Sequence, residues 1–461
     1  MSELPPDRLS ELDDAIRGEV YAPTTEGYTS GRRLWNARAT NRPAAVVRPA
    51  GAADVVETVA FAGEVDHPVT AKGGGHHVGG LAVADGAIEI DFGDMDDVRV
   101  EPDRSRVHVG PGATWGQVDH ETQVFATAVP GGQDPNIGVA GLTLGGGVGW
   151  LSRRYGLACD NLVGADVVTA DGRLLRANEA TEPELLWGLR GGGGALGIVT
   201  SFSFDLHDLG RRVFAGSLMF PADELATALE HYRSAMAEAP RPVRLLAGSM
   251  VLPDSDYYPS AIRGRRASML IGCFAGEPAA GRRALRPLRE RVDPVLDSFR
   301  ERSYLAWQRA GTSLGRRRTD VRSQYVESLT PAVIEAIVAA VEGAPSDGAT
   351  VFVSPRSGAE TDPTPTATAY SHRSDAHHIL AEARWDGEAL DDEHVGWTRS
   401  VARRLNPHTT GEVALNFLTA DEGPDRIRGA FGSNLERLVQ LKTTWDPENR
   451  LRMNPFIEPR R

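Results

Sequence analysis

Cysteine and lysine are the two residue types that this sequence of 461 residues has least of. Only Cys159 and Cys273 are present, too few for a disulfide framework or a zinc site. Of the 50 basic residues only Lys72 and Lys442 are lysines, and 63 acidic residues give a net charge of −13. This balance argues against a nucleic-acid partner and against an anionic membrane surface.

Long apolar runs are also missing. No segment approaches 18 continuous apolar residues, so no membrane-spanning helix is expected. The opening residues, Met-Ser-Glu-Leu-Pro-Pro-Asp, have neither a basic stretch nor an apolar run, so we expect no signal peptide and a cytoplasmic location. Apolar content of 41% and charged content of 25% are typical of a globular protein, and the length predicts two or three domains.

Glycine, in contrast, is abundant and clustered. In the stretch from Pro68 to Gly80, the β-prone run 69–71 leads into Gly73, Gly74 and Gly75, and two histidines follow. Consecutive glycines let main-chain N–H groups converge on an anion, and an imidazole at the rim of such a turn can act as a nucleophile. Because histidine pairs are more often metal ligands or surface residues, this stretch alone does not decide the chemistry.

A second glycine region runs from Pro130 to Gly149 and carries eight glycines in twenty residues with almost no charge. A flexible linker is usually polar, whereas this region interleaves apolar residues such as Ile137, Leu142 and Leu144. We therefore predict a buried loop pressed against a large flat ligand.

A third glycine run, 190–197, matches the dinucleotide fingerprint by its letters. A predicted helix precedes these glycines and a predicted strand, 198–204, follows them, which reverses the strand–turn–helix order that the fingerprint requires. The sequence therefore does not predict a classical nicotinamide site.

The remaining pattern predicts an α+β fold. Residues 1–40 resemble a polar lead-in with one or two helical turns. After residue 209 the glycine density falls, and apolar spacing predicts an antiparallel sheet backed by helices. The strands are expected at 245–252, 268–274, 350–353 and 378–385, and the helices at 225–236, 330–341 and 391–405.

Together these motifs resemble the berberine-bridge-type FAD-linked oxidases, within the vanillyl-alcohol-oxidase-like flavoprotein superfamily. The matching stretches are 72–80, 131–132, 138–150, 155–161, 187–200, 416–417 and 446–454. The resemblance implies a two-part FAD-binding domain of the PCMH type, with an inserted substrate domain of antiparallel sheet backed by helices. The expected divisions are a lead-in at 1–40, the FAD-binding domain at 41–210 and 411–461, and the substrate domain at 211–410.

The resemblance also implies the cofactor site. In this family the histidine after the glycine run is bonded to the flavin 8α-methyl carbon, and that position is His76 here. The other implied FAD-binding residues are Lys72, Gly73, Gly74, Gly75, His77, Gly79, Gly80, Gly131, Gly132, Gln133, Asp134, Asn136, Ile137, Gly138, Gly141, Gly145, Gly146, Gly147, Gly149, Trp150, Gly156, Gly197, Ile198, Val199, Asn416 and Asn454.

The chain departs from the family pattern at several positions. The loop 133–136 has no cysteine for a second flavin link, so one covalent link is expected. Lys72 stands where an arginine is usual, and it cannot make a bidentate phosphate contact. Ala414 stands where many relatives have a tyrosine proposed to help deprotonate the substrate, so the standard base is missing.

The resemblance implies transfer of a hydride from a C–H bond beside an alcohol or amine to flavin N5, with reoxidation by oxygen. Asn161 and Asn416 are expected beside the flavin, where they orient the ring or the substrate. Tyr370 and Arg373 are further catalytic candidates, with Tyr325 and His372 as other possible substrate contacts. The substrate is expected to be a small organic molecule, and the sequence selects neither its identity nor an oligomeric state.

Three alternatives stay open at this point. A flavin dehydrogenase would use an acceptor other than oxygen. A flavin-retaining binding protein would have lost its catalytic base, as Ala414 suggests. A metallohydrolase would use histidines, but it lacks carboxylates at ligand spacing and leaves the glycine loops unexplained. Its candidate ligands are His76, His77, His372, His377 and His378.

Overall fold

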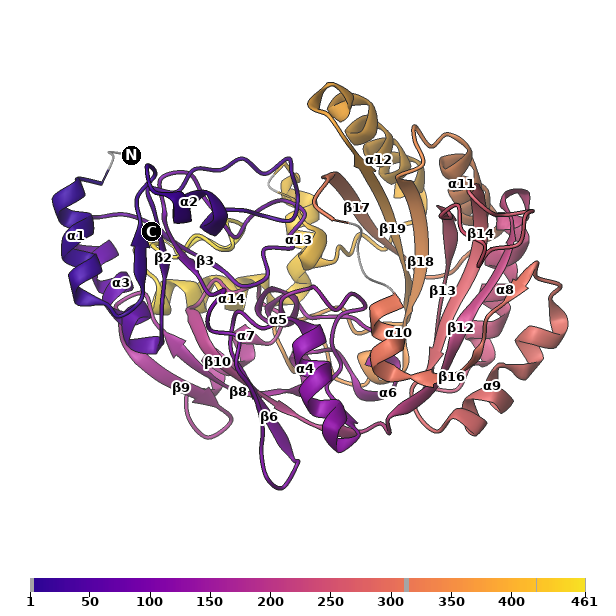
Figure 1. Ribbon diagram of the computed structural model, residues 1–461, viewed down its shortest axis with the longest axis horizontal. Helices are drawn as coiled ribbons and strands as arrows, with labels where there is room; N and C mark the ends of the chain where they lie inside the picture. Colours follow the sequence, from indigo (N-terminus) through magenta and orange to yellow (C-terminus); the bar gives the residue numbers. More distant parts are fainter. Residues whose placement is uncertain (1–3, 311–314, 420, 461) are drawn as a thin grey trace.

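The computed structural model describes residues 4–310, 315–419 and 421–460, which form two lobes side by side (Figure 1). One lobe contains a four-stranded sheet and a five-stranded sheet, and the other contains an eight-stranded sheet. The predicted α+β class is confirmed. The limits of the predicted domains, at 40, 210 and 410, stay a prediction.

The four-stranded sheet has the order β1-β2-β4-β3, in which β2, β4 and β3 run parallel. Its strands are β1 (Glu19–Tyr21), β2 (Ala45–Arg48), β3 (Val69–Lys72) and β4 (Ile88–Asp91). The helices around it are α1 (Pro6–Ala15), α2 (Glu26–Gly31) and α3 (Ala52–Glu64). Val55 and Val59 of α3, four positions apart on one side of the helix, are buried against the sheet.

The prediction of a polar lead-in over residues 1–40 was too simple. β1 pairs antiparallel with β2 and extends the sheet, and Leu12 of α1 is buried in the same apolar core. A strand of three residues is too short to show a period of two in the sequence, which is why β1 was not predicted.

The five-stranded sheet is antiparallel with the order β5-β6-β10-β8-β9. Its strands are β5 (Val98–Val100), β6 (Arg106–Val109), β8 (Leu162–Val168), β9 (Leu174–Asn178) and β10 (Ile198–Asp205). The nearby helices are α4 (Trp115–Thr122), α5 (Val139–Leu144), α6 (Ser152–Tyr155) and α7 (Pro183–Leu189), and a short pair is formed by β7 (Thr127–Ala128) and β11 (His207–Asp208).

The eight-stranded sheet is antiparallel with the order β15-β12-β14-β13-β18-β19-β17, and β16 also pairs with β12. Its strands are β12 (Arg212–Pro221), β13 (Val243–Val251), β14 (Arg266–Phe274), β15 (Leu296–Asp297), β16 (Arg300–Ser303), β17 (Arg318–Val326), β18 (Ala349–Arg356) and β19 (Ala376–Trp385). The helices of this lobe are α8 (Leu225–Glu238), α9 (Pro278–Arg291), α10 (Tyr304–Ala310), α11 (Pro331–Glu342) and α12 (Asp391–Leu405). The sequence missed the long strands β12 and β17.

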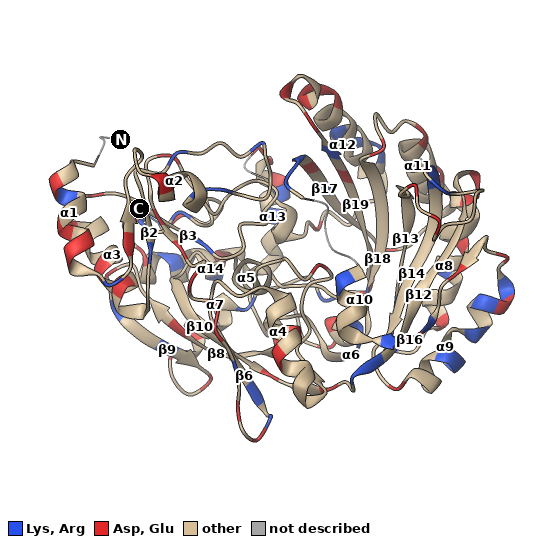
Figure 2. Ribbon diagram, viewed as in Figure 1, with Lys and Arg blue, Asp and Glu red and all other residues tan. Residues whose placement is uncertain are grey.

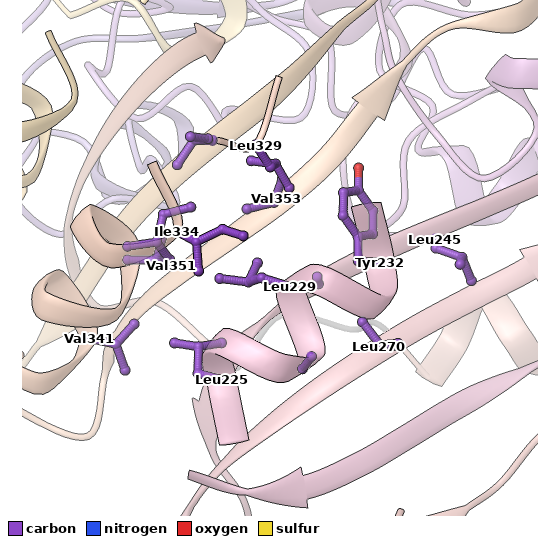
Figure 3. Close-up of a cluster of buried hydrophobic side chains, with 14 of the residues drawn as sticks. Leu225, Leu229, Tyr232, Leu245, Leu270, Leu329, Ile334, Val341, Val351 and Val353 are labelled. Atoms are coloured by element: carbon purple, nitrogen blue, oxygen red, sulfur yellow. The ribbon is translucent and has the colours of Figure 1, made fainter. Parts of the chain in front are cut away.

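One face of this sheet is packed against helices. Figure 3 shows Leu225, Leu229 and Tyr232 of α8 directed toward strand residues such as Val351 and Val353. Apolar residues recur along each helix at the helical period and form one buried stripe. These stripes pack against the strands and cover this face of the sheet. The predicted antiparallel sheet backed by helices is thus confirmed.

The C-terminal segment returns to the first lobe through α13 (Pro424–Phe431) and α14 (Leu435–Trp445), which lie among N-terminal elements in Figure 1. Lys442 of α14 is fully buried. Its Nζ donates to Asp446 Oδ2 at 2.6 Å and to the carbonyls of Ala195 and Leu451 at 3.0 Å each. A bridge between Val69 and Leu451 adds a main-chain contact to β3.

Short 3₁₀ helices complete the described structure. They occupy Gln123–Phe125, Cys159–Asn161, Ala222–Glu224, Gly358–Thr361, Glu388–Leu390, Asn406–His408, Leu415–Phe417 and Gly432–Asn434.

A buried carboxyl joins the two lobes. Asp119 of α4 accepts a hydrogen bond from Gln308 Nε2 of α10 at 2.7 Å, and the same nitrogen donates to the Gly132 carbonyl at 3.1 Å. Burial raises the pKa of Asp119 to about 7, although this hydrogen bond lowers it.

We expect Lys442→Ala to lower the free energy of unfolding by about 3–5 kcal/mol, because the buried Asp446 carboxylate would lose its countercharge. Urea unfolding monitored by tryptophan fluorescence measures this loss. Gln440→Ala, on the exposed side of the same helix, is the control and should change stability little. An unchanged unfolding midpoint for Lys442→Ala would contradict a stabilising role.

We also expect Asp119→Asn to gain stability relative to the parent chain as the pH rises. The folded-state pKa of about 7 lies above the ordinary value, so the folded chain keeps a proton that the unfolded chain releases. The stability contributed by this group therefore falls between about pH 4 and pH 7. The difference in unfolding free energy between the variant and the parent chain should increase by about 2 kcal/mol from pH 5 to pH 7, as measured by urea unfolding. The same gap for the exposed Asp223→Asn should stay constant.

Candidate functional site

The glycine turn after β3 meets the second glycine region through main-chain contact. A Cβ placed on Gly74 would lie 2.5 Å from the nitrogen and 2.7 Å from the Cα of Gly138. Gly75 has a φ of +63°, which a side chain rarely allows. The two loops can approach this closely only because both positions are glycine.

The joined loops present an open, uncharged surface. Gly74 and Gly141 are exposed, and a Cβ on Gly141 would meet nothing within 4 Å. Ile137, Leu142 and Leu144 beside them are only partly buried. Figure 2 shows the loop around α5 without Lys, Arg, Asp or Glu. This combination fits a flat, largely apolar ligand lying on the loops.

His76 stands at the edge of this surface. Its ring stacks on Trp35, with centroids 5.1 Å apart and an interplanar angle of 21°. Burial lowers the pKa of His76, the Arg384 charge lowers it further, and the Asp134 charge raises it. The imidazole is therefore neutral at neutral pH and can act as a nucleophile.

His77 and Lys72, which lie on either side of the glycine turn, contact other partners. His77 Nδ1 accepts a hydrogen bond from the Gly79 nitrogen at 3.1 Å, and burial lowers the pKa of His77 to about 4. Lys72 is buried with its Nζ 3.2 Å from Asp91 Oδ1, and it donates to the Gly31 carbonyl. Its ammonium is thus held beneath the glycine turn, and its predicted part in FAD binding stays a prediction.

The C-terminal segment reaches the same loops. Asn416 Nδ2 donates to the Leu142 carbonyl at 3.2 Å, and the Asn416 Oδ1 lies where a Cβ of Gly145 would project. Asn454 Nδ2 donates to the Gly192 carbonyl at 3.2 Å, which joins the third glycine run to the tail. The three glycine regions and the tail are therefore brought together, as predicted for one shared ligand.

Other predicted cofactor residues lie deeper. A Cβ on Gly131 would enter the Trp115 ring, a Cβ on Gly147 would meet Ala158, and Gly156 caps α6 with a φ of +87°. The remaining residues line the loop or begin β10, and their contact with FAD stays a prediction: Gly73, Gly79, Gly80, Gly132, Gln133, Asn136, Gly146, Gly149, Trp150, Gly197, Ile198 and Val199.

Two of the catalytic candidates have their polar atoms engaged. The Asn161 amide donates to the Tyr155 and Leu157 carbonyls at 3.0 and 2.8 Å and lies 2.5 Å from His207 Nε2. Arg373 is buried and pairs with both oxygens of Asp160 at 2.6 and 2.9 Å. In this arrangement the side chains of both residues stabilise the fold through these contacts.

Tyr370 is also buried, against the Gly146 and Gly191 main chain. It shares a hydrogen bond with Tyr325, and burial raises the pKa of both phenols. His372 lies 3.5 Å from Glu412. Catalytic roles for these residues stay predictions.

Two residues beside His76 were not predicted from the sequence: Trp35 of the N-terminal segment and Arg384 of β19 in the other lobe. Glu382, also of β19, feels the charges of Arg384 and Asp134. The Arg384 Cζ lies 5.0 Å from the Trp35 ring centroid. The only signal in the sequence was the pair Glu382 and Arg384 in a predicted strand. Residues two positions apart in a strand lie on the same face of the sheet.

No group of three His, Cys, Asp or Glu side chains in the described ranges is arranged to hold a metal ion. Among the described helices, none combines the length and the apolar character needed to cross a bilayer.

Comparisons with known proteins agree with this geometry. Residues 43–178 match the family described as FAD binding domain, and residues 415–458 match the family described as berberine and berberine like. The chain is 29% identical to (R)-6-hydroxynicotine oxidase of Paenarthrobacter nicotinovorans, over 96% of this chain and 97% of that protein. It is 28% identical to xylooligosaccharide oxidase of Thermothelomyces thermophilus, over 98% of this chain and 95% of that protein.

A solved structure extends the likeness to the whole fold. A variant of berberine bridge enzyme in complex with (S)-reticuline superimposes with a TM-score of 0.88, at 19% identity, over 100% of both chains. This chain is an FAD-linked oxidoreductase with an FAD binding domain and a berberine-like domain. The predicted PCMH-type fold is confirmed, and FAD is its cofactor.

The loops of this oxidoreductase fit FAD. Its open glycine positions leave room for a ring system that a Cβ would obstruct, and its partly buried Ile137, Leu142 and Leu144 suit an apolar ring face. The Gln133 Nε2 is buried and has no hydrogen-bond partner among the described residues, so it is available to a ligand acceptor. The sequence-predicted FAD site is therefore compatible with the residues present.

We expect Gly138→Ala to reduce the FAD bound by this oxidoreductase and to lower its unfolding free energy by about 1–3 kcal/mol, because the new methyl group would collide with the Gly74 main chain. The ratio of flavin to protein absorbance and urea unfolding measure the two effects. Gly396→Ala is the matched control, since a Cβ there meets nothing within 4 Å. Full flavin content in Gly138→Ala would contradict the importance of this contact.

Proposed function

We propose that this oxidoreductase oxidises a small organic substrate at a C–H bond beside an alcohol or amine, and that its FAD is attached covalently through His76. When bound, FAD supplies the two-electron acceptor that takes the substrate hydride and is reoxidised by oxygen. The observation that carries the attachment is a neutral imidazole at the exit of the Gly73–Gly75 turn, beside an open apolar surface.

The chain's own residues prepare His76 for this role. Trp35 holds the imidazole ring by stacking, which restricts its rotation and fixes its orientation. Burial has the largest influence and favours the uncharged ring, as does the Arg384 charge, and together they outweigh the opposing Asp134 charge. A nucleophile needs a free lone pair on nitrogen, and the neutral form keeps one.

Substrate positioning falls to the second lobe in this proposal. The half-buried side chains of β19 lie near the glycine loops: the His378 ring is 5.7 Å from the Phe417 ring, and Arg384 lies over Trp35. Hydride loss requires the donor carbon within about 3–3.5 Å of the acceptor, so a rigid sheet is a suitable support. Asn416 and Leu142, joined by their hydrogen bond, would fix the opposite wall.

A flavin-retaining binding protein is the second candidate, and Ala414 supports it. The Ala414 side chain has no titratable group, and its main-chain nitrogen lies 3.4 Å from Ser323 Oγ. Anaerobic mixing with alcohols and amines separates the two candidates, because only an oxidoreductase with a substrate in the panel would lose its flavin colour.

We expect His76→Ala to lose all flavin that resists acid precipitation, whereas His120→Ala, an exposed histidine on α4, should keep it. The absorbance of the acid-washed pellet near the flavin bands measures this directly and does not depend on activity. Acid-stable flavin in His76→Ala would show that His76 is not the point of attachment. Because the His76 pKa is lowered, the parent chain should still attach FAD at mildly acidic pH.

A further inference from the structure

The two lobes meet at a hydrogen bond between a buried carboxyl and a buried amide, where α4 lies beside α10 (Figure 1). Asp119 of α4 is 1% exposed, and Gln308 of α10 is 2% exposed. Gln308 Nε2 donates to Asp119 Oδ2 at 2.7 Å and to the Gly132 carbonyl at 3.1 Å. Both hydrogens of this nitrogen are therefore used.

The oxygen of the same amide has no partner. Gln308 Oε1 is buried and receives no hydrogen bond from any described residue. Turning the amide over would not help, because Oε1 would then face Asp119 and the Gly132 carbonyl, which both accept. A buried amide oxygen left unpaired lowers the stability of the fold, so a donor is expected beside it.

The Asp119 carboxyl can supply that donor when it carries a proton. A carboxylic acid and a primary amide are both planar, and each offers one donor and one acceptor. They can form two hydrogen bonds side by side, one from the acid O–H to Oε1 and one from Nε2 to the other carboxyl oxygen. An ionised carboxylate can only accept, so it would leave Gln308 Oε1 unpaired.

The surroundings of Asp119 favour the protonated form. Burial raises its pKa to about 7, and only the hydrogen bond from Gln308 opposes the shift. Among the described residues, no Lys, Arg or His forms an ion pair with Asp119. The one titratable neighbour on α10 that its charge reaches is Tyr304, a phenol whose pKa burial raises well above the ordinary value.

The other charged groups near α4 are directed to solvent. His120 and Glu121 follow Asp119 on the helix and are exposed, as are Arg99 of β5 and Arg309 of α10. The other elements packed on α4, which are β7 and the 3₁₀ helix Gln123–Phe125, contain no titratable side chain. The proton on Asp119 is therefore governed by burial and by Gln308.

The amide of Gln308 acts on the loop that is expected to receive FAD. A Cβ on Gly132 would lie 3.0 Å from Leu142 Cδ1 and 3.6 Å from Ile137 Cδ1, so Gly132 belongs to the apolar surface described above. Because a peptide bond is planar and trans, holding the Gly132 carbonyl also fixes the direction of the Gln133 N–H. The Gln133 Nε2 is the buried donor that still lacks a partner.

The position of α10 does not itself depend on the proton. Its Trp307 packs on Trp150 of the FAD-binding lobe, with ring centroids 4.9 Å apart and an interplanar angle of 56°. Both rings are buried in one apolar cluster. This contact fixes the helix, and the acid–amide pair decides how Gln308 is oriented on it.

We propose that Asp119 is a positioning residue for the cofactor: its neutral carboxyl donates to Gln308 Oε1, and the resulting pair holds the Gly132–Gln133 peptide in the orientation that receives FAD. Loss of the proton leaves a buried carboxylate and a buried amide oxygen without partners, so the Gly132 carbonyl is held less firmly. FAD binding should then weaken as the pH rises through about 7. The inference rests on FAD lying over the glycine loops, as in the proposed function, and not on its attachment.

The test measures FAD binding in the His76→Ala chain, in which FAD is expected to bind reversibly. Fluorescence titration gives the Kd at about pH 6 and at about pH 8.5, on either side of the Asp119 titration. We expect FAD to bind about threefold to tenfold more weakly at the higher pH, which corresponds to the loss of about one hydrogen bond.

Three further substitutions in the same chain identify the group that titrates. Asp119→Asn carries an NH₂ in place of the acid O–H and keeps both hydrogen bonds, so its Kd should equal the low-pH value at both pH values. Asp119→Leu forms neither bond and should bind FAD weakly at both. Glu121→Gln, a loss of charge on the exposed side of α4, is the matched control and should keep the pH dependence.

Infrared difference spectra of the flavin-loaded chain, parent minus Asp119→Asn, give a second measurement. The C=O stretch of a protonated carboxyl should be present at the lower pH and absent at the higher pH. A Kd that does not change with pH would overturn the proposal, as would the same pH dependence in Asp119→Asn or the absence of the acid band. The comparison with Asp119→Asn decides even if Asp119→Leu does not fold.

Failure of this proposal can be told apart from failure of the proposed function. If His76→Ala keeps acid-stable flavin, the attachment through His76 is wrong. The infrared spectra, together with the visible circular dichroism of the flavin at the two pH values, then decide the role of Asp119. If His76→Ala releases FAD and its Kd does not change with pH, the attachment stands and the role of Asp119 is wrong.

Discussion

The main chain at Gly74 lies against the main chain at Gly138, and the geometry of the whole site depends on that contact. Neither position can carry a Cβ without pushing the loops apart, so the turn after β3 and the long glycine region are held at one separation. His76 follows directly from the first loop, and Ile137 and Leu142 belong to the second. A neutral imidazole and a partly open apolar surface are thereby placed side by side.

The C-terminal segment packs against the first lobe with a charged side chain buried in the contact. Lys442 is one of only two lysines in the chain, and its ammonium is enclosed by Asp446 and by the carbonyls of Ala195 and Leu451. A buried ammonium is tolerated only with such partners, so the segment that supplies them has little freedom to shift. Asn416 and Asn454 of this segment are therefore held in place where they donate hydrogen bonds to the glycine loops.

The second lobe adds chemistry that the glycine loops lack. Its β19 brings Glu382 and Arg384 to the region of His76 and Asp134, where the loops themselves carry almost no charge. The helices on the other side of the sheet fix the strand, because their apolar stripes fill that face completely. In the function proposed above, substrate recognition falls to this lobe and cofactor binding to the other.

The sequence by itself determined the elements whose signal is local. The apolar period predicted α12 at both ends and placed α11 one residue early at each end, because this pattern needs only neighbours along the chain. The glycine clusters and His76 likewise identified the family and its cofactor. β17 was missed because it buries the polar residues Arg322 and Gln324, whose hydrogen-bond partners lie 100 and 82 residues away in the sequence. Only the tertiary structure decided which polar residues meet: Asn161 and Arg373 are engaged in structural hydrogen bonds with partners that lie far away in the sequence.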